Sequence, residues 1–285
     1  MEKESLNKVF SAKMTDQDFR RLSGFITEHA GIKLPEVKKV MLQSRLQKRL
    51  RHLNMTGFKE YVEFVFSEDG LQNELIHMLD LVSTNKTDFF REPVHFEFME
   101  KTILPQYIKE FPLNRPMKIW SAGCSSGEEV YTIAMTIEEF KRDHPGLDYN
   151  LLGTDISTDI LRRAVDAIYK EEKTQVVPLE LKKKYLLRSK DRTKRQVRMI
   201  PELRKKASFR RLNFMDNYYE VNEVFDVIFC RNVLIYFNRE IQEAVIRKLI
   251  MKLRKGGYFF IGHSESIMGM DVPLQQIRPT IFKRI

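Results

Sequence analysis

The sequence has little cysteine and no long apolar run. Only Cys124 and Cys230 occur among its 285 residues, and they form no CxxC pair. Two cysteines exclude a disulfide framework, so we expect reduced thiols. The six histidines show no HxxxH spacing, and we expect no structural metal. No stretch approaches the ~18 apolar residues of a membrane span, and the first residues lack the apolar core of a signal peptide. These absences predict a cytoplasmic protein without membrane insertion.

Positive charge is what the chain has in excess. Its formal net charge is +10, while 42% of its residues are hydrophobic, enough for a sizeable core. A basic protein favours an acidic partner, such as nucleic acid, an anionic membrane or an acidic protein surface. Composition alone does not choose among these three.

The first 82 residues have helical periodicity, and no strand signal precedes residue 117. Apolar residues recur at helical spacing over 16–30, and Pro35 begins a second helix that runs to about Leu53. We expect a small all-α N-terminal domain over 1–82. Beside a stripe of leucines, the second helix has basic residues within roughly 100° of one another. They are Lys38, Arg45, Lys48 and Arg49. They form either a docking surface or an ordinary solvated face.

From Met117 onward, short apolar runs alternate with helical segments. Such alternation predicts a doubly wound α/β fold with a mostly parallel sheet. We expect a linker at 83–92 and a catalytic domain over 93–285. An insert at about 170–211 interrupts the rhythm; its residues 182–211 include 14 Lys and Arg, and two alternating segments predict an antiparallel hairpin. The alternative interpretation of the insert is a solvated loop.

A glycine-containing turn follows the first predicted strand, at residues 120–129. Gly123 and Gly127 allow a ligand to approach the backbone at the carboxyl end of the strand. The turn lacks GxGxxG and has no Gly-Lys-Ser/Thr, which argues against a dinucleotide or P-loop site. Asp155 ends the next strand, where a carboxylate can accept hydrogen bonds from ribose hydroxyls. A nucleoside without phosphates fits this combination.

S-adenosylmethionine is such a nucleoside, and it has a cationic sulfonium. Glu128 and Glu129, beside the turn, suit that charge better than they suit a phosphate. Three further motifs occur in order: residues 83–92 with the core TNKTDFFRE, residues 225–237 with FDVIFCRNVLIYF, and residues 262–265 with GHSE.

Together these four motifs resemble those of the CheR-type methyltransferases, which esterify glutamates on bacterial chemotaxis receptors. The resemblance covers nearly the whole chain. It implies a class I S-adenosylmethionine-dependent methyltransferase sheet with an all-α N-terminal domain and an inserted antiparallel β-subdomain. It also implies protein-glutamate O-methyltransferase activity in sensory adaptation, with S-adenosylhomocysteine as the product and no metal.

The resemblance also implies roles for individual residues. Arg91 and Tyr236 are the implied catalytic residues, with Tyr236 near the transferred methyl group. Without the resemblance, Tyr236 in its apolar run would be interpreted as a core residue. The implied cofactor-binding residues are Asn85, Thr87, Arg91, Gly123, Glu129, Asp155, Asn213, Phe214, Arg231 and Asn232.

The implied partner is the cytoplasmic coiled-coil region of chemotaxis receptors, which has an acidic face that the basic helix would contact. In some family members the β-subdomain also binds a peptide at the receptor C-terminus. Here the turn at 189–194 lacks glycine, a departure that leaves this second contact open. We expect a monomer.

Two other functions share parts of this evidence. A nucleic-acid methyltransferase would use the basic insert, but the predicted strand at 225–229 is followed by Cys-Arg-Asn-Val instead of the Asn/Asp-Pro-Pro-Tyr/Phe of amino-methylating DNA enzymes. A non-catalytic cofactor-binding module would not need Arg91 and Tyr236. A hydrolytic triad of His263, Ser264 and Glu265 is excluded, because adjacent residues on a strand point to opposite faces.

Overall fold

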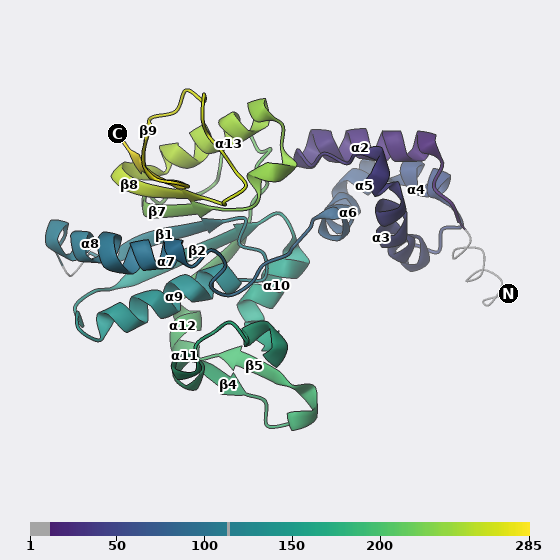
Figure 1. Ribbon diagram of the computed structural model, residues 1–285. Helices are drawn as coiled ribbons and strands as arrows, with labels where there is room; N and C mark the ends of the chain where they lie inside the picture. Colours follow the sequence, from purple (N-terminus) through teal and green to yellow (C-terminus); the bar gives the residue numbers. More distant parts are fainter. Residues whose placement is uncertain (1–11, 113–114) are drawn as a thin grey trace. The chain divides into compact units, whose positions relative to one another are not determined.

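The computed structural model describes residues 12–112 and 115–285 (Figure 1). Contacts divide the chain into two compact units. The helical unit contains the described residues up to Thr84, together with Tyr236–Asn238. The sheet unit contains Asn85–Ile235 and Arg239–Ile285. The short segment Tyr236–Asn238 was expected within the catalytic domain, whereas its contacts are with the helical unit.

The helical unit is the all-α domain that the sequence predicts. Thr15 caps its first helix with a reciprocal capping box, and Leu42, Leu46 and Leu50 are fully buried. Its helices are α2 (Asp16–Ala30), a 3-10 turn (Glu36–Lys38), α3 (Lys39–His52), α4 (Phe58–Val65), α5 (Glu68–Asn73) and α6 (Leu75–Val82). Among the described residues, none of the helices has both the length and the apolar character needed to cross a membrane.

Two of the four basic residues on the second helix have structural contacts inside this unit. Arg45 Nη1 donates to the carbonyl oxygens of three residues at the end of α6, at 2.8 to 3.1 Å. Arg49 forms a bidentate ion pair with Glu74, whose side chain is 2% exposed. The expectation of four residues on one free docking face is therefore corrected. Lys48 is exposed, Lys38 is partly exposed, and the two arginines stabilise the domain.

The sheet unit is built on a seven-stranded sheet in the order β6-β2-β1-β7-β8-β10-β9. The first five of these strands are parallel, and β10 runs antiparallel to both of its neighbours. The strands are β1 (Met117–Ala122), β2 (Tyr149–Asp155), β6 (Ala207–Arg211), β7 (Phe225–Cys230), β8 (Leu253–Ile261), β9 (Leu274–Arg278) and β10 (Ile281–Arg284). The predicted α/β fold is confirmed.

Both faces of the central strands are buried, as parallel strands covered by helices require. On one face, Ile119 and Phe229 pack with α7 (Val94–Phe98), α8 (Leu104–Glu110) and α9 (Glu128–Lys141). The residues Trp120 and Ile228, which point to the other face, are equally inaccessible. α10 (Thr158–Asp166) contacts β2 and β6, and α13 (Arg239–Met251) contacts β8. Parallel strands with covered faces bring their carboxyl ends to one edge, where ligands bind in such folds.

One expected boundary was wrong. The sequence pattern over 239–253, followed by Gly256 and Gly257, predicts a helix that the two glycines close, but α13 ends at Met251 and β8 begins at Leu253. Gly256 has φ 72°, a left-handed value, where the register between β7 and β8 shifts. The glycines therefore accommodate an irregularity at the start of a strand.

The insert contains a second, three-stranded antiparallel sheet in the order β3-β5-β4. Its strands are β3 (Ile168–Lys170), β4 (Leu186–Arg188) and β5 (Gln196–Met199), with α11 (Leu179–Tyr185) and α12 (Pro201–Lys206) beside them. β4 and β5 form the predicted hairpin. The expected limits of about 170–211 need correction, because β6 pairs with β2 in the main sheet.

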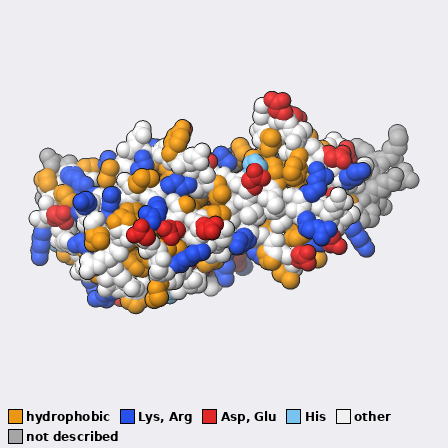
Figure 2. Space-filling view, turned by 90° about the horizontal axis from the view of Figure 1, so that it is seen from above, with side chains coloured by type: hydrophobic (Ala, Val, Ile, Leu, Met, Phe, Trp, Pro, Cys, Tyr) orange, Lys and Arg blue, Asp and Glu red, His pale blue; other side chains and the backbone are white. Residues whose placement is uncertain are grey.

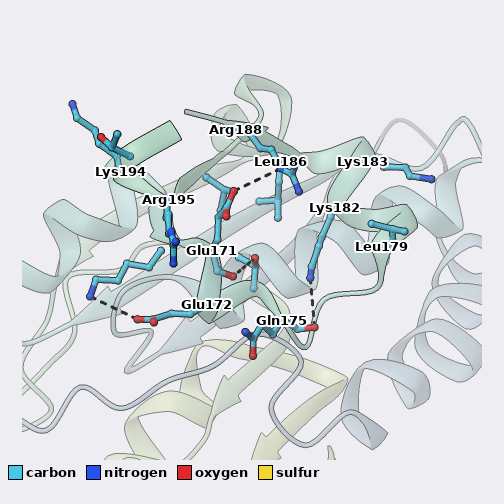
Figure 3. A pocket seen from close by; sticks show the side chains of 14 residues that line it. Glu171, Glu172, Gln175, Leu179, Lys182, Lys183, Leu186, Arg188, Lys194 and Arg195 are labelled. Atoms are coloured by element: carbon cyan, nitrogen blue, oxygen red, sulfur yellow. Dashed lines mark hydrogen bonds and ion pairs between the residues drawn. The ribbon is translucent and has the colours of Figure 1, made fainter. Parts of the chain in front are cut away.

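A pocket in this small sheet is lined by both apolar and charged side chains (Figure 3). Leu179 and Leu186 line it together with Lys182, Lys194 and Arg195. Elsewhere the charges are mixed: on the face shown in Figure 2, Lys and Arg lie among Asp and Glu. The positive excess therefore does not form one continuous stripe on that face.

Candidate active site

The glycine turn connects the carboxyl end of β1 to α9. Gly123 and Gly127 have φ 82° and 89°, so both occupy the left-handed region that favours glycine. Asp155, at the end of β2, holds this turn through its carboxylate. Its Oδ2 accepts a hydrogen bond from Ser125 N at 2.9 Å, and its Oδ1 accepts one from Ser157 N at 3.0 Å. The two parts of the predicted pocket are therefore adjacent.

The segment at residues 85–92 lies against this turn and α9. Ser125 Oγ donates to the carbonyl oxygen of Asn85 at 3.1 Å, and Phe90 N donates to Thr132 Oγ1 at 3.2 Å. Phe90 and Glu92, on either side of Arg91, have φ 52° and 57°. Non-glycine residues in this region store backbone strain, which is concentrated at functional sites. The strained residues on either side therefore fix the backbone conformation at Arg91.

A buried ion network joins this segment to the end of β7. The Arg231 side chain is 1% exposed and lies between two carboxylates, with Nη1 3.0 Å from Glu129 Oε2 and Nη2 3.0 Å from Glu92 Oε2. Arg231 also donates to the backbone carbonyl of Arg91. Glu129 accepts a further hydrogen bond from Ser121 Oγ at 2.7 Å. A buried charge requires such partners; the Nε of Arg231 is buried without a hydrogen-bond partner among the described residues.

Glu92 and Glu265 are site residues that the residue-by-residue expectations omitted. Burial acts to raise the pKa of Glu92, but the Arg231 charge and hydrogen bonds from Asn232 and His263 hold it below its ordinary value. Glu265 accepts backbone N–H groups of Asn232, Leu234 and Gly262 at 2.6 to 2.9 Å. Burial raises its pKa. The sequence signal for both was their position inside the quoted motifs.

Asn232 has φ 59° and donates from Nδ2 to Glu92 Oε1 at 3.2 Å. The structure thus brings together most of the predicted residues of the sheet unit. They are Asn85, Arg91, Gly123, Glu129, Asp155, Arg231 and Asn232.

Four other predicted residues have different surroundings. Asn213 and Phe214 follow β6, beside the end of β2; the Phe214 ring is largely buried and packs against Tyr219, with ring centroids 6.1 Å apart. The carbonyl of Thr87 accepts from Lys173 Nζ at 3.2 Å. Tyr236 belongs to the helical unit, where its carbonyl accepts from Lys33 N at 3.2 Å. The cofactor and catalytic roles of these residues stay predictions.

Family models match both units of the chain. Residues 17–83 match the model of the CheR methyltransferase all-alpha domain, and residues 85–282 match that of the CheR methyltransferase, SAM binding domain. The chain belongs to the CheR methyltransferase family. The S-adenosylmethionine-dependent methyltransferase class predicted from the motifs is thereby confirmed.

Curated relatives in the CheR family extend over nearly the whole chain. A chemotaxis protein methyltransferase of Borreliella burgdorferi is 39% identical, and the match covers 95% of each chain. Chemotaxis protein methyltransferase 2 of Pseudomonas aeruginosa is 33% identical, with 94% of this chain and 93% of the relative covered. The Escherichia coli chemotaxis protein methyltransferase is also 33% identical, with 90% and 87% covered.

The charge of the site fits the cofactor of this family. Arg231 is paired with two carboxylates, and Asp155 adds a third beside the glycine turn. An excess of negative charge favours a cationic sulfonium over a phosphate. The residues present therefore fit S-adenosylmethionine, with the glycine turn and Asp155 as its expected contacts.

Proposed function

We propose that this protein transfers the methyl group of S-adenosylmethionine to glutamate side-chain carboxylates of chemotaxis receptors. The products are glutamate methyl esters and S-adenosylhomocysteine. Membership of the CheR family and its similarity to chemotaxis protein methyltransferases support a chemotaxis receptor as the substrate. The observation that carries the proposal is the Glu92–Arg231–Glu129 network beside the glycine turn, because it joins three of the four motifs in one acidic, strained site.

The chemistry needs positioning more than acid–base catalysis. A glutamate side chain has a reference pKa of about 4.3, so at neutral pH its carboxylate is already a nucleophile. Bound S-adenosylmethionine supplies an activated methyl group. The carboxylates of Glu92 and Glu129 are both paired with Arg231 and are thus poorly suited to act as a general base. The protein's contribution is alignment of the reacting groups and exclusion of water, which can supply several kcal/mol.

Arg91 and Tyr236 are the side chains that we propose orient the reacting groups. A strong ion pair between Arg91 and the substrate carboxylate would stabilise the ground state and slow the reaction, since only differential stabilisation accelerates it. Arg91 therefore acts on the cofactor more than on the glutamate. Its flanking left-handed residues support a fixed position for it.

The receptor's acidic coiled coil is the proposed docking partner of the helical unit. Of the four predicted basic residues, Lys38 in the 3-10 turn before α3 and Lys48 on α3 are the two without the contacts inside the unit that Arg45 and Arg49 make. The β-subdomain is a second proposed contact for the C-terminal peptide of a receptor. Its edge strand β4 and the pocket containing Leu179, Lys182 and Arg195 support this contact, because a peptide strand can add to an exposed sheet edge.

Methyl transfer to a receptor fragment tests the proposal directly. The chain is incubated with methyl-labelled S-adenosylmethionine and the cytoplasmic fragment of a chemotaxis receptor. Alkali-labile release of labelled methanol identifies the ester. Arg91→Ala and Tyr236→Phe are expected to reduce turnover without unfolding the protein. Transfer of label to DNA with no ester on any receptor would support the nucleic-acid alternative, and cofactor binding without transfer would support a non-catalytic module.

Docking is tested separately from chemistry. The double variant Lys38→Ala, Lys48→Ala is expected to keep cofactor affinity and to lose receptor methylation most strongly at low salt, where exposed charges are least screened. Lys59→Ala removes one exposed charge from α4 and is the control. If the double variant methylates the receptor at the wild-type rate at low salt, the docking interpretation is wrong and these lysines belong to an ordinary solvated face.

A further inference from the structure

Two histidines and a carboxylate converge beside the ion network. His95 Nδ1 lies 3.6 Å from Glu92 Oε2, and His263 Nε2 lies 3.9 Å from the same oxygen. The three ligand atoms are all within 4.8 Å of one another. Glu92 and His95 are three residues apart at the start of α7, whereas His263 follows β8, 171 residues after Glu92. Sequence spacing therefore could not reveal this group.

His95 is the unusual member of the group. Its side chain is 0% exposed, and Nδ1 is buried without a hydrogen-bond partner among the described residues. Nε2 is 2.7 Å from Thr280 Oγ1, and the Thr280 hydroxyl donates to the carbonyl of Pro279 at 2.6 Å. Since that hydroxyl hydrogen is used, Nε2–H is the donor to Thr280, and Nδ1 has a lone pair. This lone pair faces the Glu92 carboxylate, an arrangement that a cation between them would stabilise.

The surrounding charges favour a divalent cation. Glu92 and Glu129 both pair with the single guanidinium of Arg231, which leaves one negative charge in excess within this network. Arg231 shares Oε2 of Glu92 with the two histidines, but a carboxylate oxygen has two lone pairs.

We propose that Glu92 Oε2, His95 Nδ1 and His263 Nε2 form a site for a divalent transition-metal ion of the zinc class. Imidazole and carboxylate ligands bind zinc at about 2.0–2.2 Å in tetrahedral geometry, which places ligand atoms roughly 3.3 Å apart. The two distances to Glu92 Oε2, 3.6 and 3.9 Å, need to shorten by about 0.3–0.6 Å for such a geometry, and the two histidine nitrogens, which lie within 4.8 Å of each other, must also approach. The His263 side chain is 56% exposed, so it can move toward the other two ligands. On this exposed side, the fourth coordination position of the metal would be open to water.

Thr280 is a positioning residue in this site, because its hydroxyl fixes the His95 tautomer that presents Nδ1 to the metal. The ion would join His263, after β8, to the Glu92–His95 segment, and through Glu92 to Arg231. The expectation of no metal, which rested on histidine spacing, is opposed by this proposal.

Metal titration of the untagged full-length chain, first stripped with a chelator, tests the site. Co²⁺ is the spectroscopic probe and Zn²⁺ the competitor. We expect one equivalent of Co²⁺ to bind, with visible absorption bands that Zn²⁺ removes. His263→Ala should weaken binding by at least about 100-fold, and Thr280→Ala by about 10–100-fold, the range for groups that orient a metal ligand. His52→Ala removes an exposed histidine from α3 and should bind as the wild type does.

His263→Ala carries the test because His95 variants risk misfolding, whereas His263 is largely exposed. Absence of stoichiometric binding by the wild-type chain would overturn the proposal. Wild-type affinity in His263→Ala would also overturn it, since the ion would then be bound elsewhere.

Discussion

Arg49 and Glu74 form a bidentate ion pair inside the helical unit, with Nε–Oε1 and Nη2–Oε2 distances of 2.8 and 2.6 Å. Tyr61 donates to the same carboxylate at 2.8 Å. Arg49→Ala would leave the buried Glu74 charge without its cation, so we expect the free energy of unfolding to fall by roughly 3–5 kcal/mol. Hydrogen exchange of α3 and α6 amides measures this loss. Lys48→Ala, one residue away and exposed, should change it by less than about 0.5 kcal/mol.

Similar exchange in the two variants would show that the ion pair contributes nothing net. The pair also changes how docking experiments are designed. A receptor-binding defect in an Arg49 variant would arise from a loosened domain as readily as from a lost surface charge, whereas Lys38 and Lys48 variants report on the surface.

Arg231 is the centre of the second testable relationship. Lysine keeps the charge but presents it on a single nitrogen, which cannot replace the two guanidinium nitrogens that separately contact Glu129 and Glu92. Arg231→Lys should therefore lower stability by roughly 1–3 kcal/mol, the scale of buried hydrogen bonds left unmade. It should also weaken S-adenosylhomocysteine binding. Thermal denaturation and calorimetry measure the two effects.

The control is Arg162→Lys on α10, in an exposed pair with Asp159 at 3.0 Å. Exposed pairs contribute about 0–1 kcal/mol, so this variant should match the wild type in both measurements. Equal behaviour of the two variants would show that the bridging geometry of Arg231 is unimportant.

Local sequence signals predicted the elements of this protein well. The helix over 16–30 was predicted with the bounds that the structure has, because its periodicity, cap and charges all occur within the segment itself. Ser157, a residue type that favours the N-cap position, caps α10 by accepting from Ile160 N. The β4–β5 hairpin was likewise a local pattern.

Long-range partners were not predictable in the same way. Arg231 and Glu92 are 139 residues apart, and only the order of strands places them together. The periodicity of α3 correctly predicted that its leucines are buried. It did not predict the contacts that Arg45 and Arg49 make inside the unit, because these depend on where α6 packs. Gly256 was interpreted as the end of a helix. A glycine with positive φ is expected both after a helix and at an irregularity in a strand, and the sequence does not distinguish the two.

Both cysteines should be unreactive in the folded protein. Cys124, in the glycine turn, and Cys230, at the end of β7, are at most 1% exposed. Burial raises the pKa of each thiol well above its ordinary value, and nearby carboxylates raise it further. Because the thiolate is the reactive form, a thiol reagent at pH 8 should modify neither residue until the protein unfolds. Rapid modification of two thiols without denaturant would contradict this packing.

Asp155 allows a test of how the glycine turn is held. Each of its carboxylate oxygens accepts a backbone N–H, from Ser125 on the turn and from Ser157 before α10. Asp155→Asn keeps the shape but replaces one acceptor with an NH₂ donor, which faces an N–H. We expect S-adenosylmethionine and S-adenosylhomocysteine to bind more weakly by about 1–3 kcal/mol, measured by calorimetry. Both ligands should be affected alike, because the turn and Asp155 are expected to contact the parts that they share.

The size of the loss for a smaller ligand separates two ways in which Asp155 could act. If it contacts the ribose directly, adenosine should lose as much binding free energy as the full cofactor does. If it acts only by holding the turn, amides 123–127 should exchange faster and Asp155→Ala, which leaves both N–H groups unpaired, should be worse than Asp155→Asn. Asp159→Asn, in the exposed first turn of α10, is the matched control and should leave both affinities unchanged. Unchanged cofactor affinity in Asp155→Asn and Asp155→Ala would remove Asp155 from the site, because neither the ribose contact nor the held turn could then matter to binding.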